Sequence, residues 1–286
     1  MKLIWGTDFH FNFLRNDFAV RKFGEYLSKE YPDNTGIIIT GDISDGTHIV
    51  NHLKEFSSSF TNPIYFVLGN HSYYDASWSK IDSLVTKIVD EIPHLYWLNQ
   101  GIHEVCGHVI CGVCGWYDAY HGNSNSNVEL NDFYNIAELL PQSRYRPLLL
   151  EEIRRRAGFE ADTLARHLKE ACKTDNEVII VGTHIPPYAE SAWHNGKTSD
   201  REWVPWFSSA STGATLDRFA EHNPDKKFIV LTGHSHGSGI YQRRDNMTVY
   251  TGPAVYGFPN VSGWINTKER KIQAYGPSGE KVEHKY

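Results

Sequence analysis

Five short apolar runs in this chain each stop at a small residue and are followed at once by a side chain that can bind a metal ion. The runs and the residues after them are 2–5 with Asp8 and His10, 36–40 with Asp42, 64–68 with Asn70, 178–181 with His184, and 228–231 with His234 and His236. A β-branched run that ends in glycine is typical of a buried strand leaving a sheet. Side chains that follow the ends of parallel strands converge on one edge of the sheet. The pattern therefore predicts a metal site with seven donors at that edge, and two ions.

Length and charge limit the class of protein. The 286 residues are enough for one large α/β domain, and since no Pro, Gly or Ser-rich linker divides the chain, we predict a single domain over residues 1–286. A net charge of −6 argues against a protein that holds long nucleic acid through a basic surface, so a small substrate is favoured. The apolar runs are too short for a membrane helix, and no leader pattern follows Met1, so we expect a soluble, cytoplasmic protein without a membrane partner.

The four cysteines do not define a second metal site. Cys111 and Cys114 have the Cys-x-x-Cys spacing of zinc and redox centres, but the second pair that a zinc ribbon needs is absent. Both lie in residues 108–116, which otherwise have the pattern of a buried strand. We interpret them as small apolar fillers of that strand.

Periodicity in the first third of the chain predicts alternating strands and helices. Helical spacing of apolar residues over 18–30, 47–60 and 82–92 separates the first strands, which indicates parallel strands flanked by helices. Strand-like segments at 96–98 and 109–115 are predicted to form an antiparallel addition.

The remainder of the chain combines a long helix, an irregular segment and a strand-rich tail. Residues 148–174 predict the longest helix, with the run Arg154–Arg155–Arg156 on its solvated face. The polar, irregular segment at about 117–147 is interpreted as an insertion that covers the site or builds an interface. Short strands at 239–243, 248–251, 263–267 and 271–275 suit an antiparallel second sheet.

The donor set itself indicates which metals fit. Two aspartates, one asparagine and four histidines without cysteine favour Mn, Fe, Zn, Co or Ni in an open site over a closed structural zinc site. If one carboxylate bridges two ions, the seven side chains supply four bonds to each ion. Both ions then keep positions open for water and substrate, which is typical of catalysis.

These motifs resemble those of a known family in order and approximate spacing. Asp8-Phe9-His10, Gly41-Asp42-Ile43-Ser44-Asp45, Gly69-Asn70-His71, Gly182-Thr183-His184 and Gly233-His234-Ser235-His236 are similar to the motifs of calcineurin-like metallophosphoesterases, over residues 1 to about 255. The resemblance implies an α/β fold in four layers, α/β/β/α, with two mixed sheets flanked by helices. It also implies two divalent ions, with Mn or Fe favoured.

The resemblance further assigns roles to single residues. It implies that Asp8, His10, Asp42 and His236 hold the first ion, and that Asp42, Asn70, His184 and His234 hold the second, with Asp42 as the bridge. His71 matches the general acid, and Asp45 matches the carboxylate that orients it. Ser72 stands where many members carry Asp or Glu, and Gly46 stands where the Ser/Thr phosphoprotein phosphatase branch has arginine, which argues against that branch.

Substrate contacts are expected from aromatic and histidine side chains in loops near the metal edge. Tyr117 and His121 are candidates on one side, and Trp193 and His194 on the other. These aromatics could stack a base or sugar, or could equally form the core of a lid.

The predicted function is hydrolysis of a small phosphomonoester or phosphodiester, nucleotides included, by a hydroxide that bridges the two ions, with His71 as general acid. A cyclic-nucleotide phosphodiesterase and a nuclease of the same fold are alternatives, and the acidic net charge disfavours the nuclease. A non-catalytic protein-binding scaffold is an alternative of another class, which the intact donor set argues against. The expected partner is a small phosphorylated substrate. The sequence does not determine the substrate, the native metal or the oligomeric state.

Overall fold

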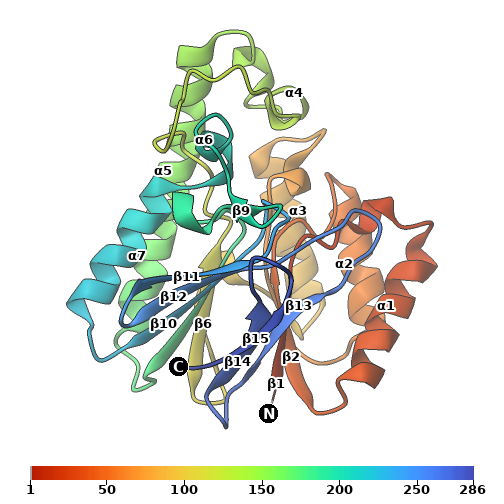
Figure 1. Cartoon of the computed structure of the whole chain (residues 1–286). Coiled ribbons are helices and arrows are strands. Elements are labelled where there is room, and N and C mark those ends of the chain that lie inside the picture. The colour runs from red at the N-terminus through yellow and green to blue at the C-terminus, as the bar shows by residue number, and fades with distance from the viewer. Residues whose placement is uncertain (1) are drawn as a thin grey trace.

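Two β-sheets pack face to face and carry helices on their outer faces in the computed structural model, which describes residues 2–286 (Figure 1). The first sheet has the order β15-β14-β13-β1-β2-β3-β4, and the second has the order β11-β12-β10-β7-β6-β5. The first sheet comprises β1 (Lys2–Gly6), β2 (Asn34–Thr40), β3 (Ile64–Val67), β4 (Leu95–Trp97), β13 (Val261–Asn266), β14 (Lys271–Tyr275) and β15 (Lys281–Lys285). The second comprises β5 (His103–Val105), β6 (His108–Val113), β7 (Val178–Thr183), β10 (Lys227–Thr232), β11 (Gly239–Arg244) and β12 (Met247–Thr251), and a separate hairpin joins β8 (Trp193–His194) to β9 (Lys197–Thr198).

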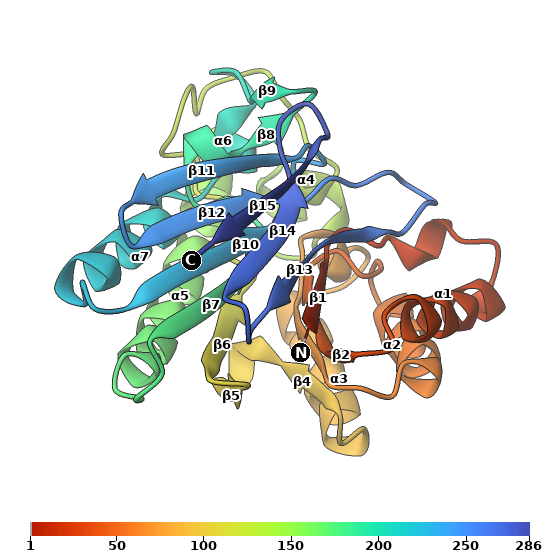
Figure 2. The ribbon, with the colours of Figure 1, turned by 60° about the horizontal axis from the view of Figure 1, so that its bottom comes forward.

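The helices form the two outer layers and the upper end of the molecule. They are α1 (Asp17–Glu30), α2 (His48–Ser59), α3 (Trp78–Glu91), α4 (Asp132–Asn135), α5 (Arg146–Ala171), α6 (Val204–Phe207) and α7 (Ala210–His222), with short 3-10 turns η1 (Phe11–Phe13), η2 (His71–Tyr73), η3 (Leu98–Gln100), η4 (Leu140–Gln142) and η5 (Ala189–Ser191). Figures 1 and 2 show α1, α2 and α3 beside the first sheet and α5 and α7 beside the second. The four-layer α/β/β/α arrangement predicted from the sequence is confirmed. No helix within residues 2–286 is long and apolar enough to cross a membrane.

Unbroken apolar runs form the central strands because both faces of each sheet are covered. In β2, Ile37 and Ile39 belong to the core under the helices of the first sheet, whereas Ile38 points into the core between the sheets. A third core lies between the second sheet and the helices α5 and α7. Alternate side chains of one strand thus pack against the outer helices on one face and against the opposite sheet on the other.

Two strand pairings differ from the sequence prediction. The segment predicted at 96–98 is β4, which pairs parallel to β3 in the first sheet, and β6 pairs parallel to β7 in the second. Only β5 adds to β6 in the antiparallel sense. The prediction of an antiparallel addition was therefore wrong, because apolar spacing indicates that a segment is a strand but does not indicate which strand it pairs with.

The strand-rich tail is divided between the two sheets. β11 and β12 are an antiparallel pair in the second sheet, but β13 pairs with β1 and carries β14 into the first sheet. The prediction of one antiparallel tail sheet was wrong in this respect, and the last strand, β15, was not predicted. β2 pairs with one edge of β1 and leaves the other edge open, and β13 pairs with this open edge. An unpaired edge exposes backbone groups that need hydrogen-bond partners, which explains why the tail comes back to the first sheet.

The structure agrees with the interpretation of Cys111 and Cys114 as buried fillers of a strand. It contradicts the prediction that Arg156 lies on a solvated face. Cys111 lies in β6 and Cys114 directly after it, both buried, and burial raises the pKa of each thiol. Arg156 is not on a solvated face. It is 5% exposed, pairs with Glu160 at 2.7 Å and packs over the ring of Trp78. Arg155, its neighbour, is exposed as predicted and pairs with Glu152.

The segment 117–147 lies at the upper end of the molecule in Figure 1, where α4 is labelled. It is attached to the chain after η2 by backbone hydrogen bonds from Asp75 to Asn135 and from Ala137 to Ala76. These bonds therefore tie the segment to the loop that follows β3 and η2. The expectation that no leader pattern follows Met1 begins at a residue that lies outside the described range.

Candidate metal centre

The loops after five strands meet at one edge, and the backbone holds them there in an uncommon conformation. Five of the seven predicted ligands have positive φ angles, between 44° and 65°: Asp8, His10, Asp42, His234 and His236. Non-glycine residues seldom adopt this left-handed region, and such residues concentrate at functional sites. Backbone hydrogen bonds from Asp8 to Gly41 (3.1 Å) and from His10 to Asp42 (2.9 Å) fasten the loops after β1 and β2 together.

Glycines beside the ligands are required by close approach. A Cβ atom on Gly41 would overlap the imidazole of His184, and one on Gly233 would overlap the carboxylate of Asp8. Each pair joins one sheet to the other. Gly41 and Gly233 therefore each make room for a ligand from the opposite sheet.

The first group of donors gathers around Asp8. The Nε2 atoms of His10 and His236 lie 3.2 Å apart, and they lie 3.9 and 3.3 Å from Asp8 Oδ1. Asp42 Oδ2 is 3.8 Å from His10 Nε2. His10 Nδ1 is buried and has no hydrogen-bond partner among the described residues. The geometry brings together the four side chains predicted for the first ion.

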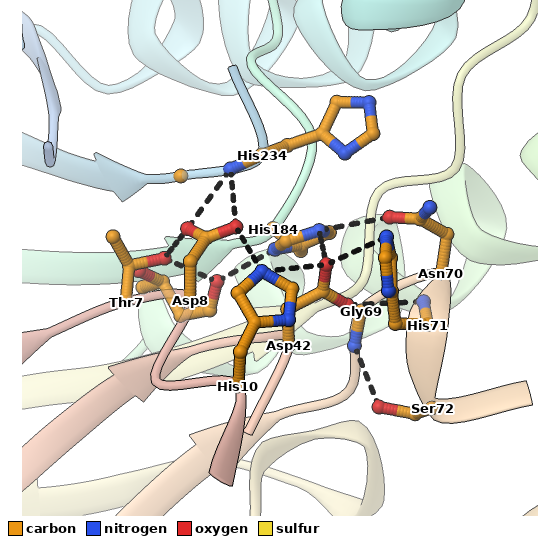
Figure 3. A network of polar contacts seen from close by, with 12 residues as sticks. Thr7, Asp8, His10, Asp42, Gly69, Asn70, His71, Ser72, His184 and His234 are labelled. Atoms are coloured by element: carbon orange, nitrogen blue, oxygen red, sulfur yellow. Dashed lines mark hydrogen bonds and ion pairs between the residues drawn. The ribbon is translucent and has the colours of Figure 1, made fainter. Parts of the chain in front are cut away.

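The second group shares Asp42 with the first. His184 Nε2 lies 3.3 Å from Asp42 Oδ2 and 3.0 Å from Asn70 Oδ1, and Figure 3 shows these side chains pointing toward one another. His184 Nδ1 donates to the carbonyl of Thr40 at 2.9 Å. A donated proton at Nδ1 leaves the lone pair of His184 on Nε2, toward the group, an arrangement common to histidine ligands.

His234 contacts Asp8 of the first group through its backbone, and its ring lies beside His184 of the second group. Its amide donates to both oxygens of Asp8 at 3.2 and 3.1 Å, and its Nε2 donates to the carbonyl of Trp206 at 3.0 Å. Its ring centre is 5.1 Å from that of His184, and His234 lines the cavity above the cluster. Because Nε2 is engaged, Nδ1 is the atom that His234 has available for a metal.

The electrostatics keep the carboxylates ionised. Burial alone would raise the pKa of Asp8 and of Asp42, but the surrounding imidazoles, His184 above all, hold both values below the ordinary range. Burial lowers the pKa of His10 to about 4, and burial together with His184 lowers that of His234 to about 4. Burial alone would lower the pKa of His184, but Asp42 and Asp8 raise it to about 9, and Asp8 likewise raises the pKa of His236. These two imidazoles therefore give up a proton when a metal ion binds. Once they are neutral beside the ionised carboxylates, the donor set fits the two divalent ions that the motifs imply.

His71 and Asp45 are not paired in the structure. The Nε2 atom of His71 is 3.9 Å from Asp42 Oδ2, and its ring stacks on Tyr74 with centroids 4.4 Å apart. The two oxygens of Asp45 instead contact His48 Nδ1 at 3.1 Å and Asn12 Nδ2 at 3.2 Å. The expected dyad is therefore absent among the described contacts, because His48, one turn further along the chain, is a nearer partner. The catalytic roles of His71 and Asp45 stay predictions.

Ser72 supports the loop that carries His71. Its hydroxyl accepts a hydrogen bond from the amide of Gly69 at 3.3 Å (Figure 3). The position that holds an acid in many similar sequences thus closes the turn between Gly69 and His71 here.

A cavity of about 640 Å³ opens above the cluster, and its floor includes Asp42, Asn70 and His71. Of the four predicted substrate residues, His194 lines this cavity. Tyr117 is fully buried and has the packing of a lid core, His121 bonds to Ser208, and Trp193 packs against Gly239. These three are not in the cavity wall.

Sequence reasoning missed two features of this site. Tyr256, in the loop between β12 and β13, packs 4.4 Å from the ring of His10 and 4.8 Å from that of His236. β12 ends at Thr251 and is followed by Gly252, the signal used for the ligands, so the loop that carries Tyr256 could have been found. Asp132 lines the cavity with 1% exposure. It lies in the irregular segment, where no pattern indicated it.

A comparison with protein families gives one assignment. The sequence model of the calcineurin-like phosphoesterases matches residues 1–238. This range contains all seven predicted ligands and His71. A search of curated proteins returned no match.

Solved structures share the fold at low sequence identity. The phosphopantetheinyl hydrolase of Mycobacterium tuberculosis is 17% identical with a TM-score of 0.61, and the match covers 90% of each chain. A dimetal phosphatase from Danio rerio is 12% identical with a TM-score of 0.60, over 100% of this chain and 99% of that one. A purple acid phosphatase from yellow lupin is 10% identical with a TM-score of 0.55, over 99% of this chain and 52% of that one. At these identities the likeness shows the fold alone.

Proposed function

Because the chain belongs to the calcineurin-like phosphoesterase family, whose members are metal-dependent hydrolases of phosphoric esters, we propose that it hydrolyses a small phosphate ester in the cavity above Asp42. The observation that supports this most is that donor atoms from both sheets gather in three overlapping groups, within 4.8 Å of one another in each group. The residues of these groups are Asp8, His10, Asp42, His71, His184 and His236. Two buried, ionised carboxylates are costly unless cations compensate their charge, and two divalent ions would do so.

Two divalent ions are proposed as the cofactors. Asp8, His10, Asp42 and His236 would hold the first, and Asp42, Asn70, His184 and His234 the second. Such ions lower the pKa of bound water and neutralise phosphoryl oxygens. The absence of thiolate from the donor set supports Mn, Fe, Zn, Co or Ni, with Mn or Fe favoured.

His71 is proposed to protonate the leaving oxygen of the ester. Its side chain is 17% exposed, lines the cavity and is held by stacking on Tyr74, so its Nε2 can reach a bound substrate. A proton held there lowers the barrier most for esters whose leaving group is a poor one. For Asp45 we propose at most an indirect effect, since its partners are Asn12 and His48.

The cavity wall favours an ester that carries an apolar or aromatic group. Trp203, Phe207 and Tyr256 line it, and Lys197 supplies a cation at the rim. This composition suits a nucleotide or an aryl phosphate, as a monoester or a diester, because aromatic faces stack planar groups and an ammonium group pairs with phosphate. The nuclease alternative is disfavoured by the net charge of −6.

A hydrolysis panel tests this proposal. Metal-free protein would be loaded with Mn²⁺ and assayed on nitrophenyl phosphate, bis-nitrophenyl phosphate, cyclic nucleotides and short oligonucleotides, with chelator-treated protein as the control. We expect metal-dependent hydrolysis of at least one small ester. If the protein binds two ions but hydrolyses none of these esters, the result would favour the scaffold alternative.

A further inference from the structure

A buried carboxylate of the 117–147 segment contacts one of the candidate metal ligands. Asp132, the first residue of α4, is 1% exposed and accepts hydrogen bonds from three side chains. Asn70 Nδ2 donates to its Oδ1 at 2.9 Å, Tyr74 donates to the same oxygen at 2.6 Å, and Tyr117 donates to Oδ2 at 2.9 Å. The two tyrosines hold the carboxylate, and the carboxylate holds the asparagine.

This contact decides which way the Asn70 amide faces. An ionised carboxylate accepts hydrogen bonds and donates none, so only the NH₂ group of Asn70 can face Asp132. The amide oxygen must then face the opposite way, where it lies 3.0 Å from His184 Nε2 (Figure 3). A rotated amide would present NH₂, which binds no cation, to the cluster.

We propose that Asp132 is a positioning residue for the second metal ion, which it serves by fixing the amide of Asn70 with its oxygen toward the cluster. The proposal rests on the metal assignment of the proposed function. It also gives the 117–147 segment a role, because α4 is tied to the loop after His71 by the hydrogen bond from Asp75 to Asn135, 2.7 Å long. Assembly of the second ion site then depends on the position of this segment.

Titration of metal-free protein with Mn²⁺ by calorimetry, supported by metal analysis, tests the proposal. The wild type should bind two ions. In Asp132→Asn the replacement amide can offer either an oxygen or an NH₂ group to Asn70, so the orientation is no longer enforced. We expect the first ion to bind as in the wild type and the second to bind about 10 to 100 times more weakly.

Asp118→Asn is the matched control. Asp118 is also a buried carboxylate of this segment, but it accepts hydrogen bonds from the backbone amides of Tyr120 (3.1 Å) and Ser211 (2.7 Å) instead of from a candidate ligand. We expect this variant to lose thermal stability and to keep both Mn²⁺ affinities. Equal weakening of the second ion in both variants would show a merely structural role and overturn the proposal.

Tyr117→Phe keeps the charge of Asp132 and removes one of its donors, so it tests the proposal even if Asp132→Asn does not fold. The second ion should bind several times more weakly than in the wild type. If folded Asp132→Asn binds the second ion as tightly as the wild type, the inference is overturned. If only Tyr117→Phe folds, the same result in that variant overturns it. A wild type that binds two ions without hydrolysing any ester refutes the proposed function alone, and one that binds no ion refutes both.

Discussion

Asp42 is the residue on which both donor groups depend, since its Oδ2 lies within 4 Å of His10, His71 and His184. Asp42→Asn removes the charge of the proposed bridge and keeps the size of the side chain. We expect metal content to fall from two ions to at most one, and kcat/KM to fall more than about 100-fold, because an ion contributes several kcal/mol of charge stabilisation.

Asp45→Asn is a suitable control for this substitution, because Asp45 also follows β2 but contacts Asn12 and His48. It should keep both ions. Full hydrolysis by Asp42→Asn with two ions bound would refute the shared-ligand assignment.

His71→Ala separates acid catalysis from metal binding. His71 lies beside Asp42, but it is not among the proposed ligands, so both ions should remain. Loss of the proton donor should reduce kcat for alkyl phosphates about 100-fold and should reduce it far less for nitrophenyl esters, whose leaving group needs no proton. Paired rate measurements on the two ester classes check this. Equal losses would argue against a general acid role.

Gly41→Ala tests whether the motif glycines serve close approach. Gly41 has a φ of +91°, and an added Cβ would overlap the ring of His184; Gly107 has a φ of +77° and open space around it. Both alanine variants bear a backbone strain of about 1 kcal/mol. Only Gly41→Ala must also displace a ligand, so it should lose a further 1 to 3 kcal/mol, roughly, and bind less metal.

Urea unfolding and metal analysis of the two variants give the comparison. Similar stability and full metal content in both would mean that His184 moves aside without cost, which would remove the steric explanation.

At the scale of elements, one buried arginine adds a polar connection to the apolar packing that joins α5 to the rest of the fold. Arg156 donates to Tyr73, lies over the rings of Trp78 and Trp116, and pairs with Glu160, which is 1% exposed. Arg156→Met would leave Glu160 buried without its main partner, a change that typically costs about 3 to 5 kcal/mol.

Arg155→Met is the adjacent control, since Arg155 is exposed and pairs with Glu152, and surface pairs contribute about 1 kcal/mol at most. Unfolding in urea measures both. A difference between them of less than about 1 kcal/mol would contradict the structural role of Arg156.

The sequence predicted the elements better than their partners. The helices and most strands follow from local apolar spacing, which each segment carries in itself. The pairing of β4 with β3 and of β13 with β1 depends on free sheet edges that exist only after folding. The burial of Arg156 is of the same kind, because its aromatic neighbours come from distant segments.

At the scale of the whole molecule, the same contrast applies to the site. Seven candidate ligands could be predicted because each follows a strand end, and strand ends meet at one edge. Asp132 could not, since it reaches Asn70 from an irregular segment 62 residues away in the chain. Asp45 was assigned to His71 by resemblance, whereas its contacts in this chain depend on His48, which the motif does not contain.

The two sheets contribute proposed ligands to each proposed ion, so metal should stabilise the fold as a whole. Asp8, His10, Asp42 and Asn70 follow strands of the first sheet, and His184, His234 and His236 follow strands of the second. A ligand that binds only the folded state at 100 times its Kd adds about 2.7 kcal/mol of stability. For a chain of 286 residues that corresponds to a rise in Tm of roughly 4 to 5 °C.

Thermal unfolding of Mn²⁺-loaded and chelator-treated protein measures this rise. Asp42→Asn should show a much smaller difference between the two conditions, since it binds fewer ions, whereas Arg155→Met should show the wild-type difference. If the wild type binds two ions and its Tm is the same with and without chelator, the ions bind the unfolded chain as tightly as the folded one. That outcome would contradict an ion site that depends on ligands brought together from both sheets.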